Sequence, residues 1–378
     1  MSAIEESVFR RALEQAVKIV RENIDYYGDL YPAPASVEGV FPKMDNTEWT
    51  SSFWNGLLWQ CYRYTGDSLF RDCAASKLND FKRRVGRRIS TNTHDLGFLY
   101  TLSCKVQYLV TGSPDALDVC IKAADLLMER YCSKAGIIQA WGDLDNPNEK
   151  GRMIIDCLMN ITFLFWVGEK TGNRAYHEAA ERHLRNTQRY IIRDDDTTYH
   201  TYYFDTESGE ALYGKTAQGY SDDSCWARGQ AWGIYGLSLN YKYVNDDSVL
   251  LDAKRLADYF LNHLPSDGVC YWDLAFTSGE EERDSSAAAI AACGLLELSD
   301  LLPVNDSDRS RYRSEALRIM VSLCNGYVNR DCVPGCGILE HSVYSKPAGN
   351  GVDEFSTWGD YFFVECLMRL LGFTSIFW

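Results

Sequence analysis

Proline is scarce in this chain of 378 residues, with 9 in total, and no segment forms a linker rich in glycine, serine or proline. Domain boundaries usually fall in such linkers, so their absence favours a single domain over residues 1–378. No run reaches about 18 apolar residues, the length that a membrane-spanning helix needs. The N-terminal stretch MSAIEESVFRRALEQAV mixes charged and apolar residues at helical spacing, unlike a secretory signal. We therefore expect neither membrane insertion nor secretion by a standard signal.

Positive charge is also in short supply. The chain has 38 lysine and arginine residues against 53 aspartate and glutamate residues, a formal net charge of −15. Nucleic acids are bound mainly by lysine and arginine side chains that neutralise phosphates, so this balance argues against a nucleic-acid partner. An acidic substrate would also be repelled at long range. Its binding would need a few local cations, such as an arginine inside an aromatic pocket.

Motifs that mark common cofactor sites are missing. The sequence has no phosphate-binding loop, glycine-rich dinucleotide fingerprint or nucleophile elbow. Cys332, Cys336 and His341 match no standard zinc spacing, and no second cysteine pair accompanies them, so we predict no bound metal.

Cysteine, in contrast, is plentiful. The 13 cysteines are odd in number and lie mostly in segments with helical periodicity. They are typical of small buried hydrophobic residues rather than of a disulfide framework. This suits a reducing compartment, and we expect a cytoplasmic protein.

Apolar residues recur at helical spacing almost throughout the chain. Some segments are apolar on one face only. Others, such as residues 153–172 and 285–302, are apolar nearly all round, which indicates helices buried on every side. The two kinds alternate, and between a buried helix and the next one-sided helix a short turn recurs in which glycine or asparagine ends one helix and a polar residue caps the next. These turns are Thr65-Gly66-Asp67, Thr111-Gly112-Ser113, Thr171-Gly172-Asn173, Val244-Asn245-Asp246 and Val304-Asn305-Asp306.

The alternation predicts a fold. Five helical hairpins are visible, and a buried helix from Trp358 to Leu371 forms a sixth pair with the N-terminal helix. Six hairpins, each too apolar to stand alone, predict an all-α (α/α)6 barrel with inner and outer helix rings; an open superhelix of helical repeats is the alternative. The connections from outer to inner helices are long and rich in aromatic residues, so we expect the site at their end of the barrel. In one of them, Tyr199–Tyr213 alternates around a Glu-Ser-Gly turn and predicts a small β-hairpin.

Each buried helix begins with a cluster of polar and aromatic residues. If the six helices run the same way, these clusters converge on one funnel. Aromatic rings stack on the apolar faces of sugars while carboxylates and arginine bind their polar groups, so the funnel suits a carbohydrate. The clusters begin at Asn46, His94, Asp156, Trp226, Arg283 and Trp358.

Two aspartates in these clusters are candidates for catalysis. Asp156 lies among apolar residues such as Ile155 and Leu158, where an unpaired carboxyl group is expected to favour its neutral form. A raised pKa suits a general acid. Alternatively, Asp156 caps a helix, which would stabilise the anion instead. The same alternative applies to Asp95, because His94 and Asp95 precede a Leu-Gly-Phe helix start.

Arginine and histidine supply further candidates. Arg228 stands between Trp226 and Trp232, where it either clamps a substrate carboxylate or pairs with a structural aspartate. His200 lies in the predicted hairpin, which favours a functional role. Three other histidines, His177, His183 and His263, lie on outer helices and are expected at the surface.

Taken in order, the stretches DNTEWTSSFWNG, HDLGFLY, IQAWG, MIIDCLMN, YHTYYFD, QGYSDDSCWARGQAWGIYG, YWD, RDSSAAA and WGDYFFVECL closely resemble unsaturated glucuronyl hydrolases, glycoside hydrolase family 88. The resemblance covers nearly the whole chain, and it implies an (α/α)6 barrel and no metal or organic cofactor. Residue by residue, it implies that Asp156 is the acid and base and Asp95 the second essential aspartate. It also implies that Trp49, His200, Gln218, Arg228 and Trp232 line the substrate pocket. We further predict that His94, Trp141 and Ser345 bind substrate.

The resemblance also implies a reaction. The family acts on oligosaccharides left by polysaccharide lyases, in which the non-reducing uronic acid carries a C4=C5 double bond. A neutral Asp156 would protonate C4 of this vinyl ether, and the enzyme would then add water at C5. The alternatives are unsaturated rhamnogalacturonyl hydrolase activity, a sugar epimerase on the same barrel, and a non-catalytic sugar-binding protein.

Sulfate tolerance can be predicted in the same way. Family members that accept sulfated substrates carry a basic residue in the QGYSD region and a Ser-x-x-Ser-x-Lys pattern near the C-terminus. Here Ala217 precedes Gln218, and residues 345–350, SKPAGN, retain only Ser345 of the pattern. A buried anion without donors is costly, so we expect a preference for unsulfated fragments of glycosaminoglycans or gellan.

Overall fold

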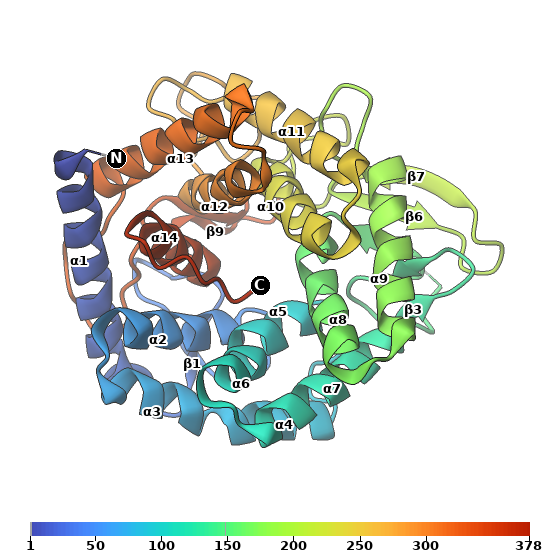
Figure 1. Ribbon diagram of the computed structural model, residues 1–378, viewed down its shortest axis with the longest axis horizontal. Coiled ribbons are helices and arrows are strands. Elements are labelled where there is room, and N and C mark those ends of the chain that lie inside the picture. The colour runs from blue at the N-terminus through green and yellow to red at the C-terminus, as the bar shows by residue number, and fades with distance from the viewer. Residues whose placement is uncertain (1, 148) are drawn as a thin grey trace.

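Helices form two concentric rings in the computed structural model, which describes residues 2–147 and 149–378 (Figure 1). The inner positions are α2 (Ser51–Thr65), the continuous run α5 (Leu96–Tyr100), η1 (Thr101–Lys105) and α6 (Val106–Thr111), then α8 (Cys157–Thr171), α10 (Ala227–Val244), α12 (Ser285–Leu301) and α14 (Thr357–Leu370). The outer positions are α1 (Ala3–Tyr27), α3 (Ser68–Ser76) with α4 (Leu78–Gly86), α7 (Pro114–Met128), α9 (Arg174–Asn186) with η2 (Thr187–Ile191), α11 (Asp247–Asn262) and α13 (Ser307–Gly326). The last inner helix, α14, packs against α2 and closes the ring. The predicted (α/α)6 barrel is confirmed.

The hydrophobic pattern explains which helices lie inside. In α12 every residue from Ser285 to Ser299 is buried, and alanines make up much of its surface, so α10 can pack closely against it. At Gly294 a side chain would come within 2.9 Å of the backbone nitrogen of Tyr235, so only glycine permits this approach. Outer helices bury one stripe instead; α11 buries its residues at helical spacing from Val249 to Phe260.

The predicted inner-to-outer turns form as expected in four of five places. Gly66, Gly112, Gly172 and Asn245 adopt the left-handed conformation, and the next residue in the first three turns caps the following helix. The prediction for Asn305 is wrong. Helix α12 ends at Leu301 and its C-cap is extended, because Pro303 disfavours helical backbone in the residue before it.

Small antiparallel sheets lie in the outer-to-inner connections. The predicted hairpin is present as β6 (Thr201–Phe204) and β7 (Ala211–Lys215), and β5 (Arg152–Ile154) adds a third strand that the sequence analysis did not predict. The other sheets are β1 (Tyr31–Pro32) with β2 (Lys43–Met44), β3 (Tyr131–Cys132) with β4 (Ile137–Ile138), and β8 (Ser342–Ser345) with β9 (Asn350–Glu354). Since all of them precede inner helices, they frame the end of the barrel where those helices begin.

Several side chains refine the sequence predictions. The cysteines are free, and ten of the 13 are buried. His183 is fully buried, contrary to expectation, because the β3–β4 connection covers α9 and the backbone N–H of Ile138 donates to its Nδ1 at 2.9 Å.

Within the described residues, no helix combines the length and apolar character needed to cross a bilayer.

A buried carboxylate joins α10, α14 and the C-terminal segment inside the ring. Glu365 accepts hydrogen bonds from the hydroxyl groups of Tyr235 at 2.5 Å and Tyr361 at 2.9 Å, and from the indole nitrogen of Trp378 at 2.8 Å. Trp378 also stacks on Phe362, so the chain returns to the centre of the ring (Figure 1). Because three donors converge on the Glu365 carboxyl, this side chain stabilises the fold and does not belong to the predicted funnel of polar clusters.

We predict that Glu365→Ala lowers the free energy of unfolding by about 3–5 kcal/mol, because it leaves three buried donors without an acceptor. Urea denaturation measures the change. Glu365→Gln retains an acceptor oxygen and should lose less. Equal stability of the alanine variant and the unmodified protein would contradict this role.

Candidate active site

A cavity of about 510 Å³ lies where the inner helices begin. Seven of the residues predicted from the sequence line it: Trp49, His94, Asp95, Trp141, Asp156, Gln218 and Ser345. They come from the start of three inner helices and from three connections. Three of the six predicted clusters, those that begin at Asn46, His94 and Asp156, therefore meet at the cavity, whereas the clusters that begin at Trp226, Arg283 and Trp358 contribute none of its described lining residues. His200, Arg228 and Trp232 are not among the lining residues.

The two aspartates lie close together in the lining of this cavity. Asp95 immediately precedes α5 and Asp156 immediately precedes α8, and neither side chain caps its helix. One oxygen of each, together with a ring nitrogen of His94, lies within 4.8 Å of the others. At this distance in a partly dry site, two negative charges repel strongly, so the pair is expected to hold one proton.

The surroundings of the two carboxyl groups differ. Asp95 accepts a hydrogen bond from the hydroxyl of Thr93 at 2.6 Å on one oxygen and from the amide of Asn160 at 3.4 Å on the other. Oδ1 of Asp156 is buried without a hydrogen-bond partner. Burial, followed by the charge of Asp95, raises the pKa of Asp156 well above its ordinary value. Burial also raises the pKa of Asp95, to about 6, but the bonds from Thr93 and Asn160 oppose that rise.

His94 lies between the two carboxyl groups. Its Nε2 is 3.4 Å from Oδ1 of Asp95 and 3.4 Å from Oδ1 of Asp156. Burial, with a smaller effect from the charge of Arg130, lowers the pKa of His94 to about 3, so the ring is neutral. A neutral ring offers at most one N–H to the pair, and it supplies no positive charge that would lower the pKa of Asp156.

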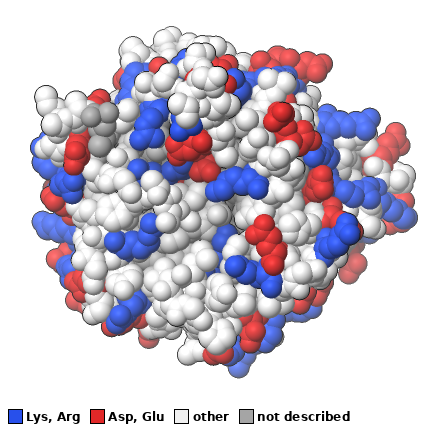
Figure 2. All heavy atoms as spheres, viewed as in Figure 1, with Lys and Arg blue, Asp and Glu red and all other residues white. Residues whose placement is uncertain are grey.

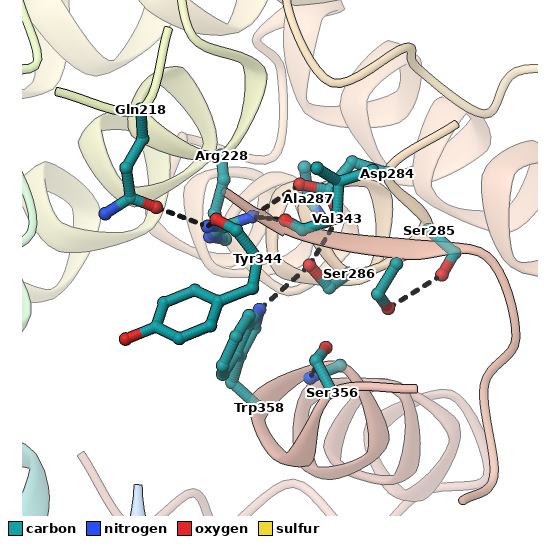
Figure 3. A network of polar contacts seen from close by, with 12 residues as sticks. Gln218, Arg228, Asp284, Ser285, Ser286, Ala287, Val343, Tyr344, Ser356 and Trp358 are labelled. Atoms are coloured by element: carbon teal, nitrogen blue, oxygen red, sulfur yellow. Dashed lines mark hydrogen bonds and ion pairs between the residues drawn. The ribbon is translucent and has the colours of Figure 1, made fainter. Parts of the chain in front are cut away.

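Arg228 does not line the cavity, and its guanidinium is surrounded by hydrogen-bond acceptors of the protein (Figure 3). Its guanidinium donates to Asp284 at 2.6 Å, to the carbonyl of Tyr344 at 2.6 Å and to the carbonyl of Val343. It also donates to Oε1 of Gln218 at 2.8 Å, which turns the amide nitrogen of Gln218 into the end that can donate to a ligand. The structural partner considered from the sequence is therefore present, namely Asp284.

His200 and Trp232 also lie behind the lining. The ring of Trp232 packs between Phe98 and Phe362, at 5.3 Å from each. The ring of His200 contacts Trp226 at 4.9 Å and lies 6.2 Å from the ring of Trp141. Burial lowers its pKa to about 3, so His200 is neutral and supports the Trp141 side of the cavity.

Several lining residues were not predicted from the sequence. Arg84 extends from the outer helix α4 to the cavity and donates to Asn46 and to backbone carbonyls. The hydrophobic periodicity of the sequence does not indicate that a residue of an outer helix lines the cavity. Tyr344 also lines the cavity, and its hydroxyl accepts from Trp49 at 3.1 Å. Thr93 could have been found, because a threonine two residues before a helix-initiating aspartate can bond to it.

The sequence profile of Glycosyl Hydrolase Family 88 matches residues 31–297. The unsaturated chondroitin disaccharide hydrolase of Streptococcus pneumoniae is 45% identical over 369 residues, which are 97% of this chain and 93% of that protein. The chain belongs to glycosyl hydrolase family 88. The resemblance and the enzyme class predicted from the sequence are confirmed, which excludes an epimerase and a non-catalytic binder.

Solved structures of family 88 enzymes agree. Unsaturated glucuronyl hydrolase from Streptococcus agalactiae superposes with a TM-score of 0.96 at 45% identity, covering 100% of this chain and 94% of that one. A mutant of unsaturated glucuronyl hydrolase from that organism, in complex with dGlcA-GalNAc6S, has a TM-score of 0.88 at 42% identity and covers 98% of this chain and 93% of that one.

We predict that Asp156→Asn makes this family 88 enzyme more resistant to heat at about pH 8. The folded-state pKa of Asp156 lies well above its ordinary 3.8. The carboxyl therefore destabilises the fold above its folded-state pKa and has no such effect below 3.8. Scanning calorimetry should show a higher Tm for the variant at about pH 8 and a difference that shrinks towards about pH 4. A lower Tm at alkaline pH would show that the anion is stabilised instead.

Proposed function

We propose that this enzyme releases the Δ4,5-unsaturated glucuronic acid from the non-reducing end of glycosaminoglycan fragments produced by lyases. The observation that supports the proposal most directly is Oδ1 of Asp156, which is buried without a hydrogen-bond partner in a cavity also lined by Trp49 and Trp141. The names and bound sugar of the related enzymes support the substrate class.

The chemistry begins with a proton. Neutral Asp156 gives its proton to C4 of the vinyl ether, which places positive charge on C5 and the ring oxygen. Water then adds to C5 and returns a proton to the Asp156 carboxylate. The resulting hemiketal opens by breaking the bond between C5 and the ring oxygen. The hemiacetal at C1 expels the remaining sugar and leaves a 4-deoxy-5-keto uronic acid.

This route explains why one acid suffices. Ordinary glycosidases place two carboxyl groups on opposite sides of the glycosidic bond. Here the two aspartates are adjacent, with oxygens within 4.8 Å of one another, which suits one proton donor and one anion beside it. We assign Asp95 the role of holding ring hydroxyls and of keeping Asp156 protonated through its charge.

The other predicted residues have proposed roles that follow from their positions. Trp49 and Trp141 stack on sugar rings, and His94, Gln218 and Ser345 bond to their polar groups. Arg228 and His200 lie behind them and act through Gln218 and Trp141 respectively. Trp232 packs against Phe98, whose ring contacts the lining residue Trp49. The proposed reaction uses no metal or organic cofactor.

Two further expectations belong to this proposal. The free and mostly buried cysteines support action in the reducing cytoplasm. The face in Figure 2 shows acidic and basic side chains interspersed, with a largely uncharged centre, which is unlike the basic surface that nucleic acids require. We therefore propose that its partners are unsaturated oligosaccharides.

We predict that Asp156→Asn lowers kcat by about 10²–10⁴-fold while disaccharide still binds. Loss of the ultraviolet absorbance of the conjugated double bond measures turnover of lyase products from hyaluronan, chondroitin, heparin, gellan and rhamnogalacturonan. A variant that turns over like the unmodified enzyme would remove Asp156 from the mechanism. Turnover confined to the rhamnogalacturonan product would favour the pectin-degrading alternative.

The lining of the cavity supports a preference for unsulfated fragments. Arg84 is the one lysine or arginine among the described lining residues, and its guanidinium already bonds to Asn46 and to carbonyl groups. Ala217 and Asn350 line the cavity where a longer basic side chain would reach it. Lys346 is bound to Glu282 instead of the cavity. A sulfate group would find no free cation there.

We predict that kcat/KM is at least about tenfold higher on an unsulfated chondroitin disaccharide than on its sulfated counterpart. The sulfate group would lose its hydrogen bonds to water on entering the cavity and would find no free cation there. Steady-state kinetics on the matched pair measures the ratio. The triple variant Ala217→Arg, Ala348→Ser, Asn350→Lys should lower this ratio. Equal or better activity of the unmodified enzyme on the sulfated sugar would refute the preference, and a ratio unmoved in the triple variant would show that other residues set it.

A further inference from the structure

Asn160 links the two catalytic aspartates through a single amide group. It lies one turn after Asp156 on α8, and its Nδ2 is 3.4 Å from Oδ1 of Asp95 and 3.4 Å from the backbone carbonyl of Asp156. Its Oδ1 accepts the backbone N–H of Phe98 at 2.7 Å, which fixes the amide so that the nitrogen faces Asp95. Asn160 is fully buried, so this orientation has no water to compete with it.

The helix α5 is built to allow this contact. A side chain at Gly97 would come within 2.4 Å of the backbone of Asn160, so only glycine lets α5 and α8 approach this closely. On the other side of Asp95, the hydroxyl of Thr93 donates at 2.6 Å and also accepts the backbone N–H of Asp95 at 3.1 Å. Asp95 thus has one donor on each oxygen, and both donors are themselves held in place.

We infer that Asn160 and Thr93 are positioning residues that place the single proton of the pair on Asp156, by bonding to both oxygens of Asp95 and leaving Oδ1 of Asp156 unbonded. The inference rests on the proposed role of Asp156 as the acid. A carboxylate that accepts a hydrogen bond on each oxygen is favoured as the anion, whereas a carboxyl with a buried oxygen that accepts none is favoured as the acid. Without the two donors, burial alone would not decide which aspartate ionises first.

Other charged groups around the pair do not remove this asymmetry. Arg130, in the turn after α7, and Arg84, on α4, lower the pKa of Asp95. From α10, the charge of Arg228 lowers the pKa of Asp156, but Arg228 is already paired with Asp284. His94 is neutral and equidistant from both aspartates, and the adjacent thiol of Cys157 has a raised pKa and carries no charge.

The test is the pH dependence of kcat in Asn160→Leu and Thr93→Val. In a pair that works with one proton, the acid limb reports ionisation of Asp95 and the alkaline limb the loss of the last proton from Asp156. Each variant removes one hydrogen bond to the Asp95 carboxylate, so the acid limb should move to a pH about one unit higher, and the alkaline limb should not move to a lower pH. The maximum of kcat should fall as well, because part of the singly protonated enzyme then holds its proton on Asp95. Thr93→Ser keeps the hydroxyl and should restore the original profile.

Asn240 provides a matched control. It is also a fully buried asparagine on an inner helix, and its Nδ2 donates to the carbonyl groups of Leu158 and Gly236, each at 2.7 Å, with no bond to the aspartates. Asn240→Leu should lower Tm without moving either limb. If Asn160→Leu and Thr93→Val likewise lower Tm and leave the profile unchanged, Asn160 and Thr93 are merely structural and the inference is wrong.

Infrared titration of the carboxyl groups separates this inference from the proposed function. With bands assigned by Asp95→Asn and Asp156→Asn, Asp156 should be the last of the two to lose its proton in the unmodified enzyme. In Thr93→Val, the last proton should be shared between the two aspartates, so that both carboxyl bands titrate with it. This result without turnover of any unsaturated sugar would contradict the proposed function and leave the inference standing. Turnover with Asp95 as the last to lose its proton would overturn the inference alone.

Discussion

The site depends on one constraint: an oxygen of the Asp156 carboxyl is shielded from water and has no hydrogen-bond partner in place of water. The side chain is 18% exposed, stands between apolar residues at the start of a buried helix, and has an oxygen that no hydrogen bond reaches. Such a group is favoured as the neutral acid. The double ring of helices provides this setting, because an inner helix is surrounded on every side and its first turn faces a cavity. Asp95 and His94 complete it with a negative charge and a neutral ring.

The protein has a net charge of −15, so an acidic sugar would have to be attracted by groups close to the cavity. Three inner helices, α2, α5 and α8, begin at the cavity, so the positive ends of their dipoles and their first N–H groups lie beside it. The buried arginines serve the framework: Arg228 holds Asp284 and Gln218, and Arg84 holds the loop around Asn46. The cavity lining therefore combines helix starts and amide groups with a single described arginine, Arg84, that is already bonded to protein groups.

The sequence predicted the rings and the cavity well, for physical reasons. A helix that is apolar all round, such as α12, has one stable place, and left-handed glycines such as Gly66 fix where each hairpin turns. What it could not predict depends on contacts between distant segments. The π-helical run η1, the burial of His183 under the β3–β4 connection and the pairing of Arg228 with Asp284 all arise from neighbours far away in sequence. Arg84 shows the limit most clearly, since an outer helix supplies a residue that lines the cavity.

The most direct test of the account follows the atoms of water through the reaction. An unsaturated disaccharide is hydrolysed in heavy water and, separately, in water labelled with heavy oxygen, and the products are examined by nuclear magnetic resonance and mass spectrometry. Protonation by Asp156 followed by hydration predicts deuterium at C4 and labelled oxygen at C5 of the keto product. Labelled oxygen only at C1 of the uronate, with no deuterium at C4, would mean direct displacement at the anomeric carbon and would contradict the central role given to a neutral Asp156.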